Sequence, residues 1–191
     1  HFALGLSDDQ VNDLAFRCEC VAHGTPSGID NTVATFGKPL VYRKGDPPMI
    51  HSLNLASPIN FVIGLTGVEG LTAKMVARVR DGRQRNRDVY DTMIKGIDAV
   101  TGQALEALKS HDLERLGELM NVCQGLLNGL QVSSWELEEL IQIARENGAL
   151  GAKLTGGGGG GSMIALCPDK SAQVMAAIRD AGYQAMEVSI G

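Results

Sequence analysis

Apolar residues recur every three or four positions over long stretches of this chain, which is the spacing of one face of an α-helix. Val89, Met93 and Ile97 follow this spacing in the middle of the sequence. A further helix is expected to begin at a capping-box pattern near Ser133 and to stop at Gly148. The remaining helices of the central part are predicted over 72–85, 88–110 and 113–130.

Shorter apolar runs bounded by Gly or Pro predict strands. Residues 31–36 and 39–43 lie on either side of Gly37 and Lys38, so we expect the two runs to pair as a hairpin. Another buried strand is expected at 61–65. The tail is expected to alternate strand, helix and strand over 163–167, 171–181 and 184–190. The whole pattern indicates an α+β protein.

The first expected helix opens with a capping-box pattern that runs from Ser7 to Gln10. Glu19 follows Ala15 by one helical turn, so it borders the apolar stripe of this helix and is expected to point toward whatever packs there. A solvated glutamate at the edge of a helix face is the alternative interpretation. The stripe consists of Val11, Leu14, Ala15 and Cys18.

Residues 23–31, His-Gly-Thr-Pro-Ser-Gly-Ile-Asp-Asn, combine backbone-shaping residues with side chains that can do chemistry. A Gly is expected to end the helix, a Pro stiffens the next step, and Gly28 permits a backbone angle that other residues avoid. A constrained loop then presents the hydroxyl of Ser27 and the carboxylate of Asp30. Such a carboxylate near a phosphate site can orient a hydroxyl and accept its proton, although the same residue types also dominate ordinary turns.

Six consecutive glycines occupy 156–161. A glycine run is by default a flexible linker, but linkers are flanked by polar residues. This run lies between two apolar segments, 149–152 and 163–167. We therefore expect a packed loop whose backbone N–H groups can approach an anion closely. The run is not a Walker A loop, because no Lys-Ser or Lys-Thr pair follows the glycines.

Two of these segments resemble motifs of the mevalonate kinases, which belong to the GHMP superfamily of small-molecule kinases. Residues 23–31 resemble the second motif nearly residue for residue, and 153–162 resemble the third, with Gly157 where the family usually has alanine. The resemblance implies transfer of the γ-phosphoryl group of ATP to the primary hydroxyl of mevalonate, with Mg²⁺ as the cofactor.

The resemblance also implies roles for individual residues. Asp30 would be the catalytic base or the group that orients the hydroxyl, and Glu19 would hold the Mg²⁺. The substrate-binding residues would be His23, Gly24, Pro26, Ser27 and Gly28. The phosphate region would be formed by Thr155, Gly156, Gly158, Gly159 and Gly160.

The resemblance implies that the chain contains part of a GHMP kinase, divided between two domains. Residues 1–60 would be the end of the N-terminal domain, and 61–191 a ferredoxin-like C-terminal domain with several helices on a small antiparallel sheet. The first motif of the family, which is rich in glycine and serine, has no counterpart in the chain. We therefore expect the chain to be inactive alone. We also expect it to associate with a retained N-terminal fragment or to form a homodimer. Another GHMP kinase, acting on phosphomevalonate, homoserine or a sugar, and a non-catalytic interaction module remain alternatives.

Composition narrows the choice of partners. The net charge of −5 gives no general attraction to nucleic acid or to anionic membranes. Arginines crowd 78–87, but they spread around the expected helix and no aromatic residues interleave for base stacking. There is no apolar run near the length of a bilayer span and no signal-peptide pattern, so a cytoplasmic location is expected. The four cysteines lack metal-type spacing and are expected to be reduced.

Overall fold

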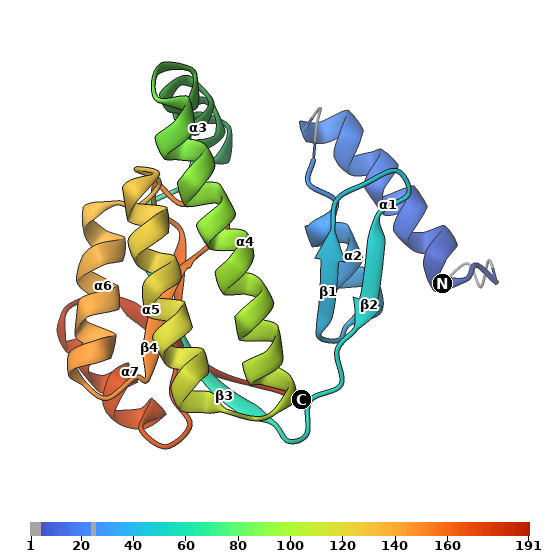
Figure 1. Cartoon of the computed structure of the whole chain (residues 1–191). Helices are drawn as coiled ribbons and strands as arrows, with labels where there is room; N and C mark the ends of the chain where they lie inside the picture. The colour runs from blue at the N-terminus through green and yellow to red at the C-terminus, as the bar shows by residue number, and fades with distance from the viewer. Residues whose placement is uncertain (1–4, 24–25) are drawn as a thin grey trace. The chain divides into compact units, whose positions relative to one another are not determined.

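The computed structural model describes residues 5–23 and 26–191, without the side chains of residues 22 and 23, and it contains two compact units (Figure 1). The first unit ends at Asn54, and the second spans Leu55–Ile190. The two units separate shortly before the strand that begins at Ile59. The assignment of 1–60 and 61–191 to two kinase domains stays a prediction.

In its described residues, the first unit has the two helices α1 (Asp8–His23) and α2 (Ile29–Phe36). The strand predicted at 31–36 is therefore wrong. Gly28, with φ 86°, starts the helix, and Gly37, with φ 59°, ends it and donates its N–H to the carbonyl of Val33 at 2.9 Å. Both conformations are left-handed and favour glycine, so the capping glycines outweigh the strand preference of the β-branched residues between them.

A two-stranded antiparallel sheet completes this unit. It pairs β1 (Leu40–Arg43) with β2 (Met49–Ser52), and Leu40 lies opposite Ser52. The strand predicted at 39–43 is confirmed, but its partner follows it in the sequence instead of preceding it. The predicted hairpin around Gly37 and Lys38 is wrong, because Gly37 caps a helix.

Helix α1 begins as predicted but packs on a different face. Ser7 N–H donates to Gln10 Oε1 at 2.9 Å, and Gln10 N–H donates to Ser7 Oγ at 3.3 Å, which forms the capping box. Of the predicted apolar stripe, Leu14 is 46% exposed and Val11 and Cys18 are exposed as well. Helix α2 packs against a neighbouring face, where the amide groups of Asn12 and Asn31 lie 2.6 Å apart.

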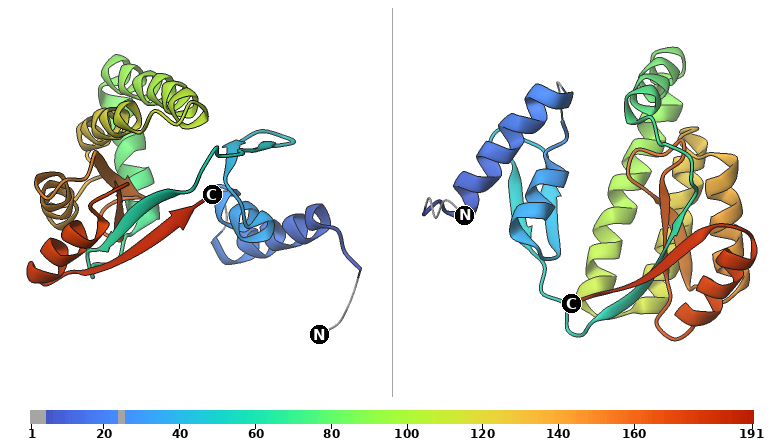
Figure 2. Two further views of the ribbon diagram at one scale, coloured as in Figure 1. Left: turned by 90° about the horizontal axis from the view of Figure 1, so that it is seen from below. Right: turned by 180° about the vertical axis from the view of Figure 1, so that it is seen from behind.

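The second unit is built on a four-stranded antiparallel sheet in the order β4-β5-β3-β6. Figure 2 shows β6 running beside β3, which is also paired with β5. The small antiparallel sheet and the strands predicted at 61–65, 163–167 and 184–190 are confirmed. The strands are β3 (Ile59–Leu65), β4 (Gly151–Thr155), β5 (Ser162–Leu166) and β6 (Gln184–Ile190).

Five helices accompany this sheet, and the helices predicted in the central part and the tail are confirmed. Helices α5, α6 and α7 contact the sheet directly, and α4 packs on α5. The cap of α6 is Ser134, whose Oγ accepts the N–H of Leu137 at 3.4 Å, so the predicted capping box at Ser133 lies one residue too early. No helix among residues 5–23 and 26–191 is long and apolar enough to span a bilayer. The helices are α3 (Thr72–Arg85), α4 (Arg87–Lys109), α5 (Leu113–Gly129), α6 (Trp135–Glu146) and α7 (Ser171–Asp180).

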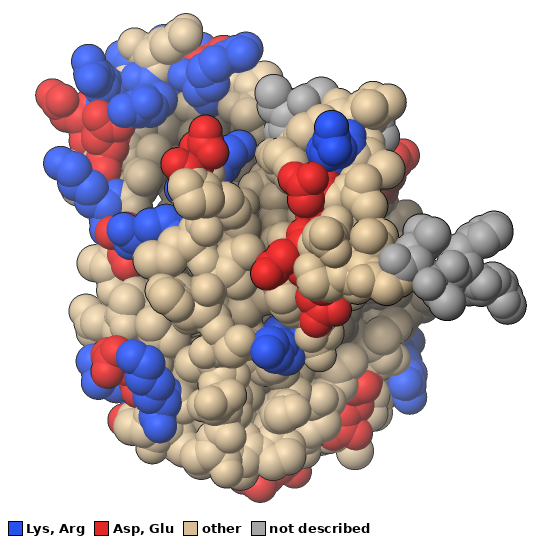
Figure 3. Space-filling view, turned by 90° about the vertical axis from the view of Figure 1, so that its right-hand side faces the viewer, with Lys and Arg blue, Asp and Glu red and all other residues tan. Residues whose placement is uncertain are grey.

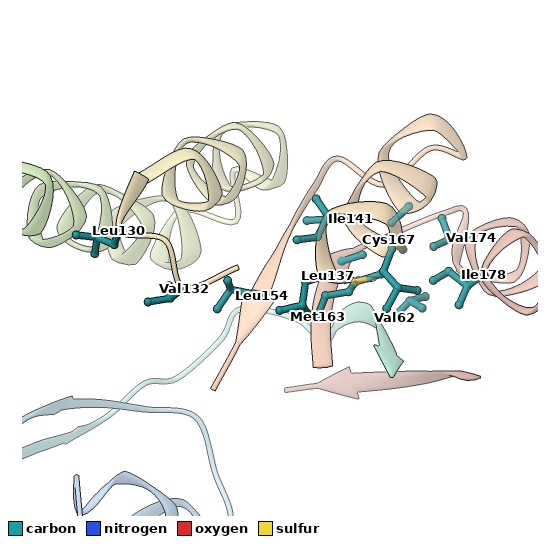
Figure 4. Packing of buried hydrophobic residues seen from close by; sticks show 14 of the residues in the cluster. Val62, Leu130, Val132, Leu137, Ile141, Leu154, Met163, Cys167, Val174 and Ile178 are labelled. Carbon is teal, nitrogen blue, oxygen red and sulfur yellow. The ribbon is translucent and has the colours of Figure 1, made fainter. Parts of the chain in front are cut away.

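The second unit has two clusters of buried apolar residues, a larger one that includes residues of α6 and α7 and a smaller one that packs α4 and α5 on β3 and β5. Burying one large aliphatic side chain contributes about 1.5–3 kcal/mol, so the many buried side chains of these clusters together stabilise the fold of the second unit. The buried apolar residues of the described chain all lie between Ile59 and Ile178, which leaves the first unit without an apolar core of its own. Figure 4 shows part of the core, including Val62, Leu137, Ile141, Met163, Val174 and Ile178.

The arginine-rich stretch lies in α3 and at the start of α4, as a solvated helix surface. Figure 3 shows Lys and Arg gathered, with some acidic residues, at the end of the second unit that contains α3. Arg83 Nε donates to Asp91 Oδ1 at 2.5 Å, and this hydrogen bond lowers the pKa of the Asp91 carboxyl. The acidic partners offset part of the positive charge on this surface.

Candidate functional site

Asp30 lies in the first turn of α2, at a position set by the glycine before it. Gly28 is the N-cap residue, and its carbonyl accepts the Thr32 hydroxyl at 2.6 Å. The Asp30 side chain is exposed at the end of the helix where the backbone dipole favours a negative charge. The carboxylate is therefore presented by the start of a helix, not by a loop as the sequence suggested.

The segment before Asp30 is tied to strand β1. The Tyr42 hydroxyl donates to the carbonyl of Ser27 at 2.8 Å, and Lys44 Nζ donates to the carbonyl of Pro26 at 3.3 Å. Ser27 Oγ accepts the N–H of Ile29 at 3.2 Å. A Cβ at Gly28 would lie 2.5 Å from Tyr42 Oη, so a side chain at this position would displace the tyrosine. Both the backbone angle and the close approach therefore require glycine at position 28.

The remaining candidates of the first unit lie on α1 or just after it. Glu19 is half-buried on α1. No group of three or more His, Cys, Asp or Glu side chains in the described chain could hold a metal ion by itself. Mg²⁺ in nucleotide sites often takes one or two carboxylates plus phosphate oxygens, so a single glutamate fits that chemistry. His23 is the last residue of α1, with its side chain outside the described part, and Gly24 lies wholly outside it.

The glycine run in the second unit is the turn of a β-hairpin. It joins β4 to β5, and Thr155 lies opposite Ser162 at the base of the turn. Five of the six glycines have φ between 73° and 137°, a range that other residues rarely adopt. The run is thus a hairpin turn and not a linker between units. The five are Gly156, Gly158, Gly159, Gly160 and Gly161.

Two neighbouring segments hold this turn by backbone hydrogen bonds. Gly159 N–H donates to the carbonyl of Val132, between α5 and α6, at 2.8 Å. Gly161 N–H donates to the carbonyl of Val68, after β3, at 2.8 Å. The Thr66 hydroxyl donates back to the carbonyl of Gly161, also at 2.8 Å. The loop is therefore packed, as the apolar residues on its two sides predicted.

The loop has a packed side and an open side. Gly158 and Gly160 are buried, and a Cβ at Gly158 would lie 2.1 Å from the carbonyl oxygen of Val132. Thr155 and Gly156 are exposed, and a Cβ at Gly156 would meet nothing within 4 Å. Backbone on the open side is thus free to approach an anion, whereas the packed side fixes the conformation of the loop.

Gly157, where the resembling family usually has alanine, faces the first residue of α3. A Cβ at this position would lie 2.6 Å from Thr72 Oγ1 and 2.9 Å from Thr72 Cγ2. The threonine side chain occupies the space that a methyl group would need. The glycine at 157 is therefore matched to Thr72 in this chain.

The outer edge of β4 is covered by side chains. In a sheet, an edge strand ordinarily leaves every second residue with an unpaired N–H and carbonyl. Here both polar groups of Ala152 and of Leu154 are bonded. The four contacts are Asn121 Oδ1 to Ala152 N at 3.1 Å, Arg145 Nη2 to Ala152 O at 2.8 Å, Gln124 Oε1 to Leu154 N at 2.9 Å and Lys153 Nζ to Leu154 O at 2.7 Å.

Lys153 and Cys123 form a partly buried pair beside this edge. Burial lowers the pKa of the Lys153 ammonium group, and the nearby Cys123 opposes that shift. Burial also raises the pKa of the Cys123 thiol, against the opposing effect of Lys153, and so favours its protonated form. The side chain of Lys153 thus folds back along its own strand, β4, which leads into the glycine turn. Its Nζ donates to the carbonyl of Leu154.

Comparison with known proteins places these features in a family. Residues 104–184 match the family described as GHMP kinases C terminal. The chain is 39% identical over 186 residues to the mevalonate kinase of Thermococcus sibiricus, covering 95% of this chain and 55% of that protein. It is 38% identical over 192 residues to the mevalonate kinase of Pyrococcus furiosus, covering 98% and 56%. The chain belongs to the GHMP kinase family.

Solved structures of GHMP kinases agree with this assignment. The structure of L. major mevalonate kinase in complex with R-mevalonate matches with a TM-score of 0.90 and 34% identity, covering 98% of this chain and 60% of that one. A phosphomevalonate kinase from Streptococcus pneumoniae matches with a TM-score of 0.82 but only 17% identity, which supports the fold alone. The chain spans about half the length of the curated relatives that it matches.

Within this GHMP kinase chain, the predicted site residues fall into two sets. Ser27, Gly28 and Asp30 gather at the start of α2 in the first unit, and the glycine turn lies in the second. Sequence reasoning missed Tyr42, which anchors the Ser27 segment from a strand without any distinctive motif. It also missed Gln124, although a glutamine one turn after Met120 on the apolar face of α5 is a signal for a buried polar contact.

Proposed function

We propose that a kinase containing this chain transfers the γ-phosphoryl group of ATP to the primary hydroxyl of mevalonate, giving 5-phosphomevalonate. The observation that supports the proposal most directly is the position of Asp30. Its side chain is exposed in the first turn of α2, shortly after Ser27 and Gly28 in the sequence. Relatives between 38% and 41% identical are mevalonate kinases, and they support this choice of substrate.

Asp30 is the group that orients the substrate hydroxyl and accepts its proton. Phosphoryl transfer passes through a loose transition state, so positioning of the hydroxyl contributes more than early proton removal. A helix start fixes the carboxylate better than a mobile loop would, and the Tyr42 bond to Ser27 fixes the segment before it. In this proposal Ser27 and Pro26, with His23, Gly24 and Gly28, shape the substrate side of the pocket.

Glu19 is proposed to hold Mg²⁺, which, when bound, neutralises charge that develops on the nucleotide phosphates. Thr155 and Gly156 on the open side of the glycine turn are proposed to face the phosphate region, with Gly158, Gly159 and Gly160 holding the turn in shape. The exposure of Thr155 and Gly156 and the burial of Gly158 and Gly160 support this division of roles.

We propose further that the 191 residues do not catalyse the reaction alone. The chain spans only about half the length of its mevalonate kinase relatives, so the proposed partner is the remaining sequence that those relatives contain. The exposed apolar residues of α1 support such a contact, because Leu14 is 46% and Val21 is 91% exposed. A homodimer is the alternative partner, and light scattering of the purified chain distinguishes the two.

A kinase assay with ATP and three acceptors, mevalonate, phosphomevalonate and homoserine, tests the proposal. The assay compares the 191-residue chain with a longer polypeptide that carries it. Mevalonate is expected to be phosphorylated by the longer form alone. Preference for another acceptor would indicate a different GHMP kinase, and no turnover in either form would favour a non-catalytic module.

A further inference from the structure

Gln124 is a buried polar residue whose amide oxygen and amide nitrogen both form hydrogen bonds. It lies on α5 with 2% of its surface exposed. Its Oε1 accepts the N–H of Leu154 at 2.9 Å, and its Nε2 donates to Glu138 Oε1 at 2.8 Å and to Ser133 Oγ at 3.3 Å. A buried amide with partners on both of its ends restricts every element that it touches.

The partners of Gln124 lie on the strand that enters the glycine turn and next to the segment that supports the turn. Leu154 immediately precedes Thr155, where the chain enters the turn. Ser133 immediately follows Val132, whose carbonyl accepts Gly159 N–H at 2.8 Å. Val132 and Leu154 belong to the same buried cluster, and both are labelled in Figure 4. One side chain therefore links the strand that enters the turn to the segment on which the turn rests.

Asn121 provides a natural comparison on the same helix. It bonds the same strand, with its Oδ1 accepting from Ala152 N–H at 3.1 Å and its Nδ2 donating to the Leu150 carbonyl at 3.2 Å. Both of its bonds stay at the start of β4, and neither reaches the segment at 132–134 on which the turn rests. A purely structural role predicts that the two amides behave alike.

We infer that Gln124 is a positioning residue that sets the conformation of the glycine turn for binding the phosphates of ATP. This role rests on the kinase function proposed above. A glycine-rich loop loses much conformational entropy when it is ordered, and Gln124 restrains the turn before the nucleotide arrives. Without the amide, the turn is restrained less before the nucleotide binds and loses more conformational entropy on binding, so ATP binding weakens while the acceptor site in the other unit is unaffected.

The first measurement needs no catalysis. Amide exchange of the glycine turn is followed in the purified 191-residue chain for Gln124→Met, Asn121→Leu and the parent, at equal temperature below each melting point. Gln124→Met is expected to speed exchange at Gly159 N–H by about tenfold, because its supporting segment is released, while Asn121→Leu changes it little. Equal acceleration in both variants would overturn the inference.

The second measurement separates positioning from folding. In the active longer kinase, Gln124→Met is expected to raise the KM for ATP about fivefold or more and to leave the KM for mevalonate unchanged, and Asn121→Leu to change neither. Faster exchange with an unchanged KM for ATP would also overturn the inference. If the parent kinase does not phosphorylate mevalonate, the proposed function fails, whereas the exchange measurement still decides whether Gln124 restrains the turn.

Discussion

The hydroxyl of Tyr42 donates a hydrogen bond of 2.8 Å to the carbonyl oxygen of Ser27, and this contact connects strand β1 to the segment that leads into Asp30. Tyr42→Phe removes the bond and keeps the ring. A net loss of about 0.5–1.5 kcal/mol in positioning corresponds to a two- to tenfold fall in kcat for mevalonate phosphorylation. Steady-state kinetics of the active kinase provide the measurement.

Tyr183→Phe is the control for this experiment, because it also removes a hydrogen-bonded hydroxyl but lies in the second unit, bonded to Glu139. We expect its kcat to match the parent. An equal fall in both variants would mean that the loss reflects general destabilisation and not the position of Ser27.

The two carboxylates proposed to act in the reaction should respond differently to neutralisation. Asp30→Asn keeps the shape of the side chain but cannot accept a proton, so we expect kcat to fall by about a hundredfold or more with little change in KM. Glu19→Gln weakens a proposed metal ligand, so raising the Mg²⁺ concentration should restore part of the activity of this variant. The same increase should restore no activity to Asp30→Asn. Near-normal turnover by Asp30→Asn would show that this residue has only a structural role.

Gly156 and Gly158 form a matched pair for separating the two sides of the glycine turn. Their φ angles are 74° and 76°, so alanine is strained to a similar extent at both. The Cβ of Gly158→Ala meets the Val132 carbonyl, whereas that of Gly156→Ala meets open space. We expect Gly158→Ala to lower the melting temperature by about 5 °C more than Gly156→Ala does. Gly156→Ala is expected to raise the KM for ATP while destabilising the fold less. Equal melting temperatures would contradict the packing of the turn.

Tyr183 makes stability depend on pH in the alkaline range. Its hydroxyl donates to Glu139 Oε2 at 2.5 Å, and this hydrogen bond raises the pKa of Tyr183 from 10.0 to about 12. Because the folded pKa is the higher one, the contribution is fully present below pH 10 and is lost as the pH rises toward 12. Urea unfolding at several pH values should show a smaller loss of stability over this window for Tyr183→Phe than for the parent. Cys167, with a pKa raised by burial to about 11, titrates alike in both and cancels in the comparison.

The two units should differ in their resistance to local unfolding. All the buried apolar side chains in the described chain lie between Ile59 and Ile178, so the first unit relies on hydrogen bonds such as that between Asn12 and Asn31. Hydrogen exchange on the purified chain should therefore be faster in α1, α2, β1 and β2 than in α6 and β5. Comparable protection in both units would mean that the first is stable without further partners.

The long helices could be predicted from sequence because many positions repeat one spacing, and single exceptions do not change the pattern. The strand prediction for 31–36 was wrong because the stretch is short, and the residues that begin and end the helix, Gly28 and Gly37, lie outside it. The apolar stripe of α1 was also identified, but a periodic pattern does not specify which element covers it. Val11 and Leu14 consequently remain exposed, and α2 packs beside them.

The candidate site residues could be located from two local motifs, because the residues of each motif are neighbours in the sequence. Ser27 and Asp30 belong to the first motif, and the glycine run forms the second. The supporting residues could not. Tyr42 and Ser27 are 15 residues apart, and Gln124 and Leu154 are 30 apart, so their contacts depend on how distant elements pack. Spacing along one helix or strand contains no information about such pairs.

The side chains that cover the outer edge of β4 also bear on self-association. Exposed edge strands are templates on which a second chain can add a strand and begin to aggregate. With the N–H and carbonyl groups of Ala152 and Leu154 already bonded, β4 offers no such template. Any assembly that extends this sheet from one copy of the protein to the next is therefore confined to the opposite edge, along β6.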